Sequence, residues 1–483
     1  MVIPDEVKFL TQKLKEKGFK AFIVGGCVRD FLRDVQPEDW DIATDAKPEE
    51  IGKIFLRSFS DNKFGTVTVL TGSQNSKLKE IEITPFRIDE KYTDKRHPDK
   101  IRWAKSIEED LARRDFTVNA IAIEPQTLKI IDPFSGQKDL KKKILKAVGD
   151  PRDRFNEDAL RMIRAVRFAT TLGFRIEKDT GKAIKENSRW LKMISKERIR
   201  DEFLKIIMSE RADEGIELLR KNLLLKYTVP ELEEGYGVSQ NKHHIYECYE
   251  HSLLSLRFAA HQGFNKYVRL AALFHDIAKP RVKKGKGLNA TFYNHEVVGA
   301  KMTTQILRGL KFSRKDIEKI TKLVRFHLFY YNVGEVSDAS VRRLVRKVGP
   351  DNMEELLEVR IADRIGSGVP KAEPYKLRHL KYTIEKVSQD PISAKMLKIN
   401  GDDIMRTLAI KPGSKVGEIL DILLGEVLDN PKKNDKNFLE KEVEKLGKLS
   451  DEKLKTAAQK ARKAREVIET KRDEMTKKKY WVT

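Results

Sequence analysis

The sequence has 483 residues, of which 40% are hydrophobic and 35% are charged. This length exceeds that of one ordinary domain, so we expect about two to four domains with packed cores. No apolar run approaches the roughly 20 residues that a membrane span needs, and the N-terminus lacks the features of a signal peptide, so we predict a cytoplasmic protein with no membrane partner. The two cysteines, Cys27 and Cys248, are far apart and give no support for a disulfide framework or a thiolate zinc site.

Basic residues outnumber acidic ones. The chain has 97 Lys and Arg against 74 Asp and Glu, which gives a formal net charge of +23 at pH 7. Such an excess suits a polyanionic partner, because Lys and Arg that neutralise phosphates release condensed counterions. Nucleic acid is therefore the first candidate partner. Lys/Glu-rich helices of heat-adapted proteins have a similar composition, so the charge alone leaves both interpretations open.

The first part of the chain predicts a small mixed α/β domain. Apolar residues recur at helical spacing before Gly18. The apolar run at residues 21–24 predicts a strand that ends in the glycine turn Gly25-Gly26, and a short helix is expected from Val28. Alternating or β-branched segments predict further strands at residues 40–44, 66–70 and 80–84.

From about Phe155 onwards, the apolar residues follow the 3.6-residue period, so we expect the rest of the chain to be helical. The predicted fold class is an α/β head with a small mixed sheet, followed by a mostly α-helical neck, body and tail. Pro-, Gly- and Asn-rich breaks separate the helical parts. The predicted domains are a head at residues 1–145, a neck at 146–228, a body at 229–390 and a tail at 391–483.

Two carboxylates in the head form a candidate catalytic site. Asp39 and Asp41 flank Trp40 in a predicted strand, whose two-residue period places both carboxylates on one face. Such carboxylates repel each other unless cations lie between them, and Mg²⁺ held by carboxylates is what nucleotidyl transfer needs. A solvated strand face is the alternative. Glu82 is a candidate third metal-binding carboxylate, and its alternative role is also a solvated strand residue.

The glycine turn just before these carboxylates strengthens the nucleotide interpretation. Glycines allow backbone amides to approach a triphosphate, and Arg29 on the next helical turn adds a fixed charge. Residues 25–30 and 39–44 resemble the head motif of class II tRNA nucleotidyltransferases and bacterial poly(A) polymerases. These proteins belong to the DNA polymerase β-like superfamily. The resemblance implies a polymerase β-like head with Mg²⁺ as cofactor, and nucleotide binding by Gly25, Gly26 and Arg29.

The resemblance continues in two further segments. Residues 113–120 resemble the second motif of the family, which is associated with ribose and phosphate recognition. Residues 150–161 resemble the neck, in which the matching Asp and Arg read the Watson–Crick edge of the incoming base. On a helix, this Asp and Arg would share one face, and an ordinary ion pair is the alternative. The nucleotide-binding residues that the resemblance implies here are Arg113, Arg114, Asp115, Asn119, Arg154, Asp158, Arg161 and Arg164.

Two segments bear on which nucleotides are added. Residues 86–98 resemble the flexible loop of enzymes that add the terminal A, although His97 stands where the family often has a second Arg. Residues 64–69 resemble the CCA-adding branch more than the poly(A) polymerase branch. The resemblance therefore implies that the protein adds C, C and A, from CTP and ATP, to the 3′ end of tRNA. An A-adding enzyme or a poly(A) polymerase is the nearest alternative.

A spaced set of histidines and aspartates follows in the predicted body. Imidazole and carboxylate together suit a transition metal, or a bridged pair of ions that makes hydroxide from water. Residues 273–280 resemble the core of HD phosphohydrolases, which implies a site for Mn²⁺, Ni²⁺ or Co²⁺ that acts on RNA ends or nucleotides. A vestigial HD fold without metal is the alternative. The expected ligands are His251, His275, Asp276 and Asp363, with His295 and His327 completing a second site.

The tail and the order of the domains complete the sequence interpretation. Residues 400–403 and 410–417 resemble the distal part of HD-containing CCA-adding enzymes, and the final charged helix is expected either to contact tRNA or to be a solvated face. An HD phosphohydrolase with a tRNA-binding head is a further alternative. Stringent-response synthetase/hydrolases also combine such a head with an HD domain, but in them the HD domain comes first. The sequence leaves the oligomeric state open.

Overall fold

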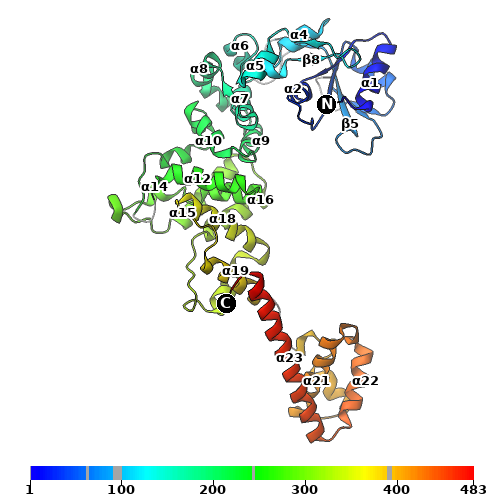
Figure 1. Cartoon of the computed structure of the whole chain (residues 1–483), viewed down its shortest axis with the longest axis vertical. Coiled ribbons are helices and arrows are strands. Elements are labelled where there is room, and N and C mark those ends of the chain that lie inside the picture. Colours follow the sequence, from blue (N-terminus) through cyan, green and yellow to red (C-terminus); the bar gives the residue numbers. More distant parts are fainter. Residues whose placement is uncertain (1, 61–64, 91–99, 242–244, 389–393, 483) are drawn as a thin grey trace. The chain divides into compact units, whose positions relative to one another are not determined.

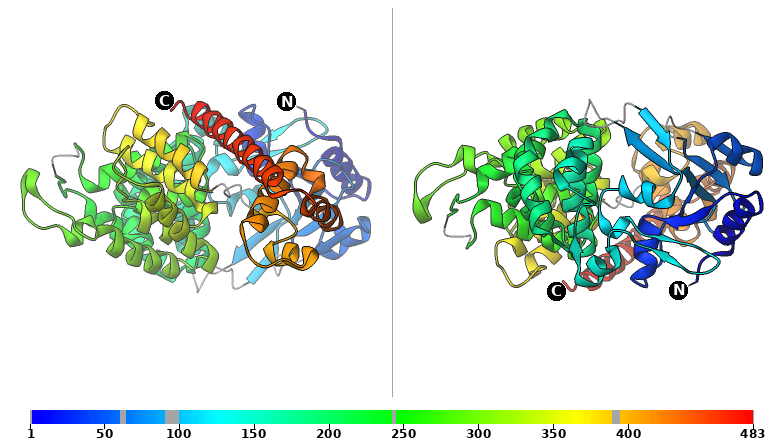
Figure 2. Two further views of the ribbon diagram at one scale, coloured as in Figure 1. Left: turned by 90° about the horizontal axis from the view of Figure 1, so that it is seen from below. Right: turned by 90° about the horizontal axis from the view of Figure 1, so that it is seen from above.

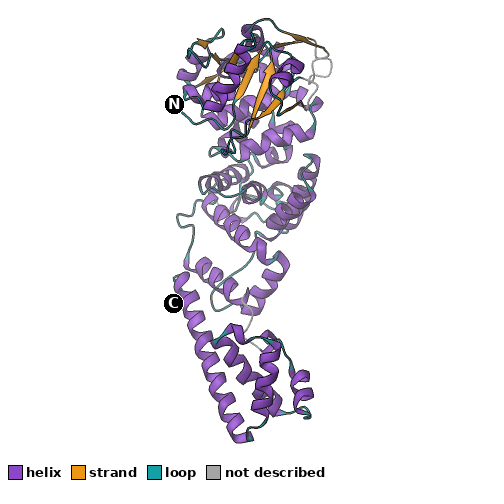
Figure 3. Ribbon diagram, turned by 90° about the vertical axis from the view of Figure 1, so that its right-hand side faces the viewer, coloured by secondary structure: helices purple, strands orange, loops and turns teal. Residues whose placement is uncertain are grey.

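The computed structural model describes residues 2–60, 65–90, 100–241, 245–388 and 394–482. The chain divides into two compact units, one of residues 1–328 and 354–370 and the other of residues 329–353 and 371–483. The strands of the main sheet lie in the N-terminal head, and helices dominate the rest of the chain (Figure 3). The predicted fold class is confirmed. The division into four smaller domains stays a prediction.

The head contains a seven-stranded mixed sheet in the order β3-β4-β5-β2-β1-β8-β9 within the described residues. β2 and β5 are parallel, and the other neighbouring strands are antiparallel. The strands predicted at residues 21–24, 40–44, 66–70 and 80–84 are β1, β2, β4 and β5. The bounds in this sheet are β1 Ala21–Val24, β2 Asp41–Thr44, β3 Ser58–Ser60, β4 Val67–Leu70, β5 Glu80–Pro85, β8 Ala122–Ile123 and β9 Ile130–Ile131.

Both faces of the sheet are largely buried at the central strands β1 and β2, where successive residues point to opposite sides. Ile23 and Ile42 pack with α1 (Asp5–Glu16) and α3 (Pro48–Ile54) in one core cluster. Val24 and Ala43 pack with α4 (Ile107–Ala112) in another. The strands of the head are drawn in blue beside these helices in Figure 2. The sheet is therefore a rigid support for the residues at its strand ends.

The neck begins with two helices separated by a short break. The carboxylate of Asp150 accepts a hydrogen bond from the Arg152 N–H and caps the first of them, which starts at Pro151. The second helix ends at Leu172 and is followed by Gly173, whose φ of 68° is left-handed. A short parallel pair, β10 with β11, joins the end of the head to the neck. The bounds are α6 Pro151–Glu157, α7 Leu160–Leu172, β10 Ile144–Leu145 and β11 Arg175–Ile176.

The rest of the first unit is helical, as the periodicity predicted. Cys248 at the start of α12, like Cys27 in α2, is buried with a free thiol. The remaining helices of this unit are α2 Gly26–Leu32, α5 Gly136–Lys142, α8 Lys178–Asn187, α9 Lys196–Ile207, α10 Ala212–Lys221, α11 Leu225–Thr228, α12 Cys248–His261, α13 Lys266–Phe274, α14 Lys279–Val282, α15 His295–Gly309, α16 Arg314–Phe326 and α18 Met353–Gly366.

The second unit is also helical and has its own core. Ile419 and Leu423 of α21 pack with Leu454 of α23 and with Leu439 of α22. These three helices lie together in Figure 1. None of the described helices of the chain is long and apolar enough to cross a membrane. The helices of this unit are α17 Asp338–Val348, α19 Tyr375–Ser388, α20 Gly401–Leu408, α21 Ser414–Asp429, α22 Lys436–Gly447 and α23 Asp451–Lys479.

Candidate active sites of the head and body

The carboxylates of the head gather at the start of β2. Asp41 is the first residue of this strand and pairs in parallel register with Glu82 of β5. Burial and the neighbouring charges of Asp39 and Glu82 raise the pKa of Asp41 to about 7, although Arg114 opposes this shift. Neighbouring carboxylates offer several hard oxygen ligands to one cation. This donor set fits Mg²⁺.

Asp39 differs slightly from its prediction. It is exposed and precedes the strand, so the strand alternation that was expected to place both carboxylates on one face does not extend to it. The reason is that β1 ends at Val24, opposite Asp41, so no partner strand continues alongside Asp39. Trp40 and Ile42 nevertheless pack in the same core cluster, as the predicted alternation requires.

The glycine turn lies directly against the carboxylates. Gly25 has a φ of +84°, a conformation that favours glycine. A Cβ atom at this position would come within 3.3 Å of Asp41 Oδ2 and within 3.2 Å of Arg114 Nη1. The turn therefore leaves space for a ligand beside Asp41. A side chain at position 25 would narrow this space.

Arg113 and Arg114 are both held by Asp110, a residue that sequence reasoning missed. Asp110 is almost fully buried, and its Oδ1 accepts from Arg113 Nη2 at 2.7 Å while its Oδ2 accepts from Arg114 Nη2 at 3.1 Å. Burial alone would raise the pKa of Asp110, but the two guanidinium groups lower it. The signal was present in the sequence, because an Asp three and four residues before two arginines can reach both on a helical turn.

A buried polar network connects the head with the neck. Arg29 donates to Asn119 Oδ1 at 2.9 Å, and Asn119 Nδ2 donates to Asp115 Oδ1 at 3.1 Å. Arg164 of α7 donates to Asp115 Oδ2 at 2.6 Å and lies 3.9 Å from Glu202 of α9. Although burial opposes it, the Arg164 guanidinium lowers the pKa of Asp115 to about 2. These four predicted nucleotide-site residues are thus brought together, and they bind one another.

The predicted base-reading pair has a different geometry from the one expected. Asp158 and Arg161 were expected on one face of a helix, but Asp158 is not helical and has φ −138° and ψ 105° between α6 and α7. Its carboxylate accepts a hydrogen bond at 3.0 Å from the N–H of Leu160, the first residue of α7, and this local bond favours a break between the two helices. The expectation that Asp158 and Arg161 share one face of a helix is therefore wrong.

Each member of this pair is held by another residue. Arg198 of α9, which sequence reasoning missed, lies with its Nη2 2.7 Å from Asp158 Oδ2. Arg161 Nη1 donates to Glu157 Oε2 at 2.5 Å, and Glu157 also accepts from Arg154 Nη2 at 2.5 Å. The two side chains are therefore oriented by separate ion pairs before any nucleotide binds.

The segment that resembles the A-adding loop lies largely outside the described residues. β6 (Arg87–Glu90) and β7 (Lys100–Trp103) form an antiparallel pair on either side of it. Residues 91–99, which include His97, are not among the described residues, and neither are residues 61–64. The prediction about this loop stays a prediction.

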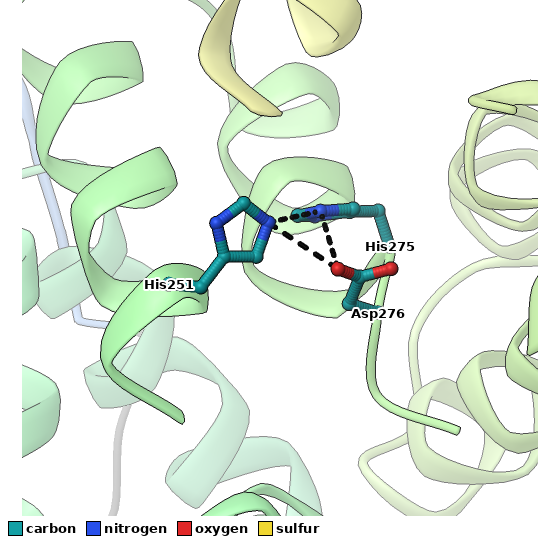
Figure 4. A group of neighbouring side chains, drawn as sticks. All are labelled: His251, His275 and Asp276. Carbon is teal, nitrogen blue, oxygen red and sulfur yellow. Dashed lines mark hydrogen bonds and ion pairs between the residues drawn. The ribbon is translucent and has the colours of Figure 1, made fainter. Parts of the chain in front are cut away.

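The body brings the predicted HD residues together from separate helices. His251 of α12 has its Nε2 2.9 Å from that of His275, which follows α13, and 3.3 Å from Asp276 Oδ2. Asp363 of α18 places its Oδ1 3.3 Å from the same His251 nitrogen. His251, His275 and Asp276 point toward one another in Figure 4. This group is buried and can hold one metal ion.

Asp276 also faces a second group on its other side. Its Oδ1 lies 3.3 Å from His295 Nε2 and 3.8 Å from His327 Nε2, and these two nitrogens are 3.3 Å apart. His295 is the first residue of α15, and His327 follows the last residue of α16. Asp276 therefore has one oxygen for each group, which is the arrangement of a carboxylate that bridges two metal ions.

Backbone carbonyl groups fix the orientation of three of these histidines. The Nδ1 atoms of His275, His295 and His327 lie 2.7 to 2.8 Å from the carbonyl oxygens of the residues three positions earlier. A carbonyl oxygen can only accept, so each Nδ1 carries the proton and each Nε2 is left as the ligand. This arrangement is typical of metal-binding histidines, so the donor set fits a transition metal.

Charges within the body cluster compensate one another. Burial opposes a positive charge on His275, but Asp276 and Asp363 raise its pKa to about 10. Burial and the nearby His275 lower the pKa of His327 to about 3. Asp276 and Asp363 have pKa values well below the ordinary range because His275 and His251, and for Asp276 also Lys279, outweigh the effect of burial. The cluster borders a cavity of about 850 Å³ that Asp276, His295, His327 and Asp363 help to line.

The mixed sheet, the strand-end carboxylates and the adjacent glycine turn define the head as that of a nucleotidyltransferase. Residues 21–146 match the family model described as "Poly A polymerase head domain". Residues 173–235 match the model described as "Probable RNA and SrmB- binding site of polymerase A", and residues 290–443 match a tRNA nucleotidyltransferase domain 2.

Relatives identify the family within this class. The chain is 35% identical over 462 residues to the CCA-adding enzyme of Ligilactobacillus salivarius (strain UCC118), which covers 94% of this chain and 99% of that protein. It is 32% identical over 445 residues to the CCA-adding enzyme of Pediococcus pentosaceus, covering 92% of this chain and 98% of that one. The chain belongs to the CCA-adding enzyme family. The resemblance found in the sequence is confirmed for the nucleotidyltransferase, and the HD domain stays a prediction.

Solved structures agree with this assignment. The chain is similar to the Bacillus stearothermophilus CCA-adding enzyme in complex with CTP, with a TM-score of 0.61 and 27% identity, covering 91% of this chain and 96% of that one. The Thermotoga maritima CCA-adding enzyme complexed with tRNA has the same fold, with a TM-score of 0.51 and 20% identity over 92% of this chain.

Proposed function

We propose that the chain adds C, C and A, from CTP and ATP, to the 3′ end of tRNA without a nucleic-acid template. The observation that carries this proposal is the set of Asp39, Asp41 and Glu82 beside the Gly25 turn, in a chain 35% identical to a CCA-adding enzyme over 94% of its length. In the reaction, the 3′ hydroxyl of the RNA attacks the α-phosphate of the nucleotide, and pyrophosphate leaves.

The residues of the head have separate tasks in this reaction. We propose Asp39 and Asp41, with Glu82, as the residues that hold Mg²⁺, which when bound stabilises the charge on the reacting phosphate and the leaving group. The Gly25 turn lets the backbone approach the triphosphate. Arg114, whose charge opposes the rise in the pKa of Asp41, offers positive charge to the same region.

Base selection is assigned to Asp158 and Arg161. Cytosine and adenine both present an amino donor and a ring-nitrogen acceptor on the Watson–Crick edge, whereas uracil and guanine present a carbonyl and a ring N–H. A carboxylate accepts from the amino group, and a guanidinium donates to the ring nitrogen. The two side chains therefore complement C and A, and not U or G, as a template base would.

Sequencing of the 3′ ends tests the proposal and separates it from its alternatives. Purified protein is incubated with tRNA that lacks CCA and with tRNA that ends in CC, with CTP and ATP supplied separately and together. We expect two C residues from CTP alone on the first tRNA, one A on the second, and CCA from both nucleotides. Addition of A only would identify an A-adding enzyme, and long A tails would identify a poly(A) polymerase.

We propose a second activity in the body, the hydrolysis of phosphate esters at RNA ends or in nucleotides. The observation that favours it is Asp276, whose two oxygens each lie 3.3 Å from a histidine Nε2 in a buried cluster. The cluster would hold Mn²⁺, Ni²⁺ or Co²⁺, which lowers the pKa of bound water and so supplies hydroxide near neutral pH. The backbone carbonyl partners of His275, His295 and His327 keep their Nε2 atoms directed at this position.

Metal analysis combined with an activity assay tests the second proposal. The protein is purified without chelator, its metal content is measured, and hydrolysis of a phosphomonoester and of a 2′,3′-cyclic phosphate is assayed with Mn²⁺, Ni²⁺ or Co²⁺. We expect bound metal and metal-dependent turnover. Absence of both would leave the body as a structural and tRNA-docking element.

We also propose that the neck and the tail bind tRNA. The net charge of +23 supports a polyanionic partner, and residues 173–235 of the neck match a model described in terms of RNA binding. The cytoplasmic location stays a prediction.

A further inference from the structure

One arginine on the wall of the body cavity has no acidic partner. Arg364 lies on α18, directly after the proposed ligand Asp363, and lines the cavity of about 850 Å³. Its Nε is buried, and its side chain forms no hydrogen bond or ion pair within the described part of the chain. The nearby charge of Asp363 acts on Arg364, but within the described residues no carboxylate is bonded to its guanidinium group, which lies beside the candidate metal site.

The other cationic groups on this wall are engaged. Arg360 Nη1 lies 2.7 Å from Asp363 Oδ2. Lys279 Nζ lies 2.6 Å from Asp276 Oδ2 and donates to Gln240 at 2.6 Å. These cations offset the charge of the proposed metal ligands. Arg364 forms no such ion pair within the described residues, although the charge of Asp363 acts on it.

The position of Arg364 is unfavourable without a ligand. Arg360 and Arg364 are four residues apart on one helix, and like charges at this spacing repel. A buried N–H group without an acceptor costs further free energy. An anion bound in the cavity would remove both costs. The same cavity contains the candidate metal ligands. An anion that binds Arg364 in this cavity therefore lies beside the candidate metal site.

We propose that Arg364 binds a phosphate group of the substrate, in an anion subsite beside Asp276, His295 and Asp363. This inference rests on the proposed hydrolase activity of the body and names its ligand chemistry, a tetrahedral phosphate. The planar guanidinium can donate two parallel N–H bonds to two phosphate oxygens, a geometry that a lysine ammonium cannot reproduce. The same subsite would hold the phosphate ester before cleavage and inorganic phosphate after it.

Phosphate binding by the whole protein tests the subsite. Affinity for inorganic phosphate is measured by titration calorimetry on Mn²⁺-loaded protein and on chelator-treated protein, with metal content measured in parallel. We expect Arg364→Gln to weaken phosphate binding at least tenfold in both forms and to leave the metal content unchanged. Arg364→Lys should fall between this variant and the wild type. Arg308→Gln, which removes the same charge from an exposed position of α15, should bind phosphate as the wild type does.

The outcomes separate this inference from the hydrolase proposal. Equal phosphate affinity in Arg364→Gln and the wild type overturns the subsite, whatever the metal content. If the wild type binds no metal, the hydrolase proposal fails, and the subsite is then judged on the chelator-treated proteins alone. If Arg364→Gln does not fold, protection replaces substitution: phosphate should slow the modification of Arg364 by phenylglyoxal in the wild type, mapped by mass spectrometry. Unchanged modification would contradict the subsite.

Discussion

The head and the body of this chain each gather acidic side chains, yet they offer opposite environments to a metal ion. In the head, Asp39 and Glu82 are exposed, and the proposed ligands Asp39, Asp41 and Glu82 are all carboxylates. In the body, buried histidines from several helices face Asp276 and are oriented by backbone carbonyls. Hard oxygen ligands in an open site suit Mg²⁺ that arrives with a nucleotide, whereas buried imidazoles suit a resident transition metal.

The two sites also differ in how far neighbouring side chains compensate their charges when no metal ion is bound. Burial and the nearby carboxylates disfavour the negative charge of Asp41 and raise its pKa to about 7. A bound proton or a cation stabilises this group. In the body, Lys279 and Arg360 lie against the acidic groups, and the pKa of His275 is raised to about 10. The head therefore depends on its ligands for electrostatic balance, while the charges of the body are largely balanced before a metal binds.

The largest effect is expected from the head carboxylates. Asp39→Ala and Asp41→Ala should each lower nucleotide addition by about 10³-fold or more, because several kcal/mol of charge stabilisation are lost. Binding to tRNA, measured by gel shift, should change little. Glu38→Ala is the matched control, since Glu38 is exposed and pairs with Lys77 at 2.8 Å. Full activity in both Asp variants would refute the assignment of the head site.

The bridging position of Asp276 makes a prediction about metal stoichiometry. Asp276→Ala should lose both metal ions of the body, because the two groups share this residue. His295→Ala should lose only the ion on its own side. Elemental analysis of protein purified without chelator would show the two losses. If the two variants lost the same amount of metal, Asp276 would not be a bridge.

The network between head and neck predicts a pH-dependent loss of stability. The pKa of Asp115 is about 2 instead of its ordinary 3.8, so its carboxylate stabilises the fold above pH 3.8 and loses this contribution as the pH falls toward 2. Asp115→Asn should therefore lower the free energy of unfolding by about 2 kcal/mol at pH 5 and by progressively less below pH 4. Denaturant unfolding at pH 5, 4 and 3 measures the difference. A difference that stays constant over this range would exclude Asp115 as its source.

A smaller effect is expected from the residue that orients the base-reading carboxylate. Arg198→Ala frees Asp158 and should relax the discrimination of C and A against U and G by about tenfold, which corresponds to about 1.4 kcal/mol. The ratio of kcat/KM between CTP and UTP reports this. Arg200→Ala, two residues further along the same helix, is the control and should keep the wild-type ratio. Removal of the Asp158 or the Arg161 side chain should relax nucleotide selection at least as much. Unchanged discrimination against U and G in these variants would contradict the assignment of the two residues to base selection.

The sequence predicted features that depend on local pattern and missed those that depend on distant partners. Strand alternation predicted β1, β2, β4 and β5, and helical periodicity predicted the helical remainder. Arg198 could not be predicted as the partner of Asp158, because 40 residues separate them and only the packing of α7 against α9 brings them close. The break at Asp158 was missed because its local bond to the Leu160 N–H competes with helix formation.

In the body too, the sequence motif predicted the site residues, whereas their contacts depend on packing that the sequence does not reveal. Its histidines and aspartates were predicted from a resemblance, and the structure brings them together in one buried cluster. The carbonyl partners of the Nδ1 atoms carry no signal in the sequence, since every residue has a carbonyl group. Arg364 was overlooked for a related reason: the missing partner of a charged side chain becomes visible only once the surrounding residues are placed.

The independence of the two sites is tested most directly by removing the metals and returning only one. The protein is treated with chelator, supplied with Mg²⁺, CTP and ATP, and assayed for CCA addition to tRNA and for hydrolysis of a 2′,3′-cyclic phosphate in the same preparation. We predict that Mg²⁺ alone restores CCA addition to the level before treatment, while hydrolysis stays absent until Mn²⁺, Ni²⁺ or Co²⁺ is added. Failure of Mg²⁺ alone to restore CCA addition would contradict the assignment of nucleotidyl transfer to the oxygen-ligand site of the head.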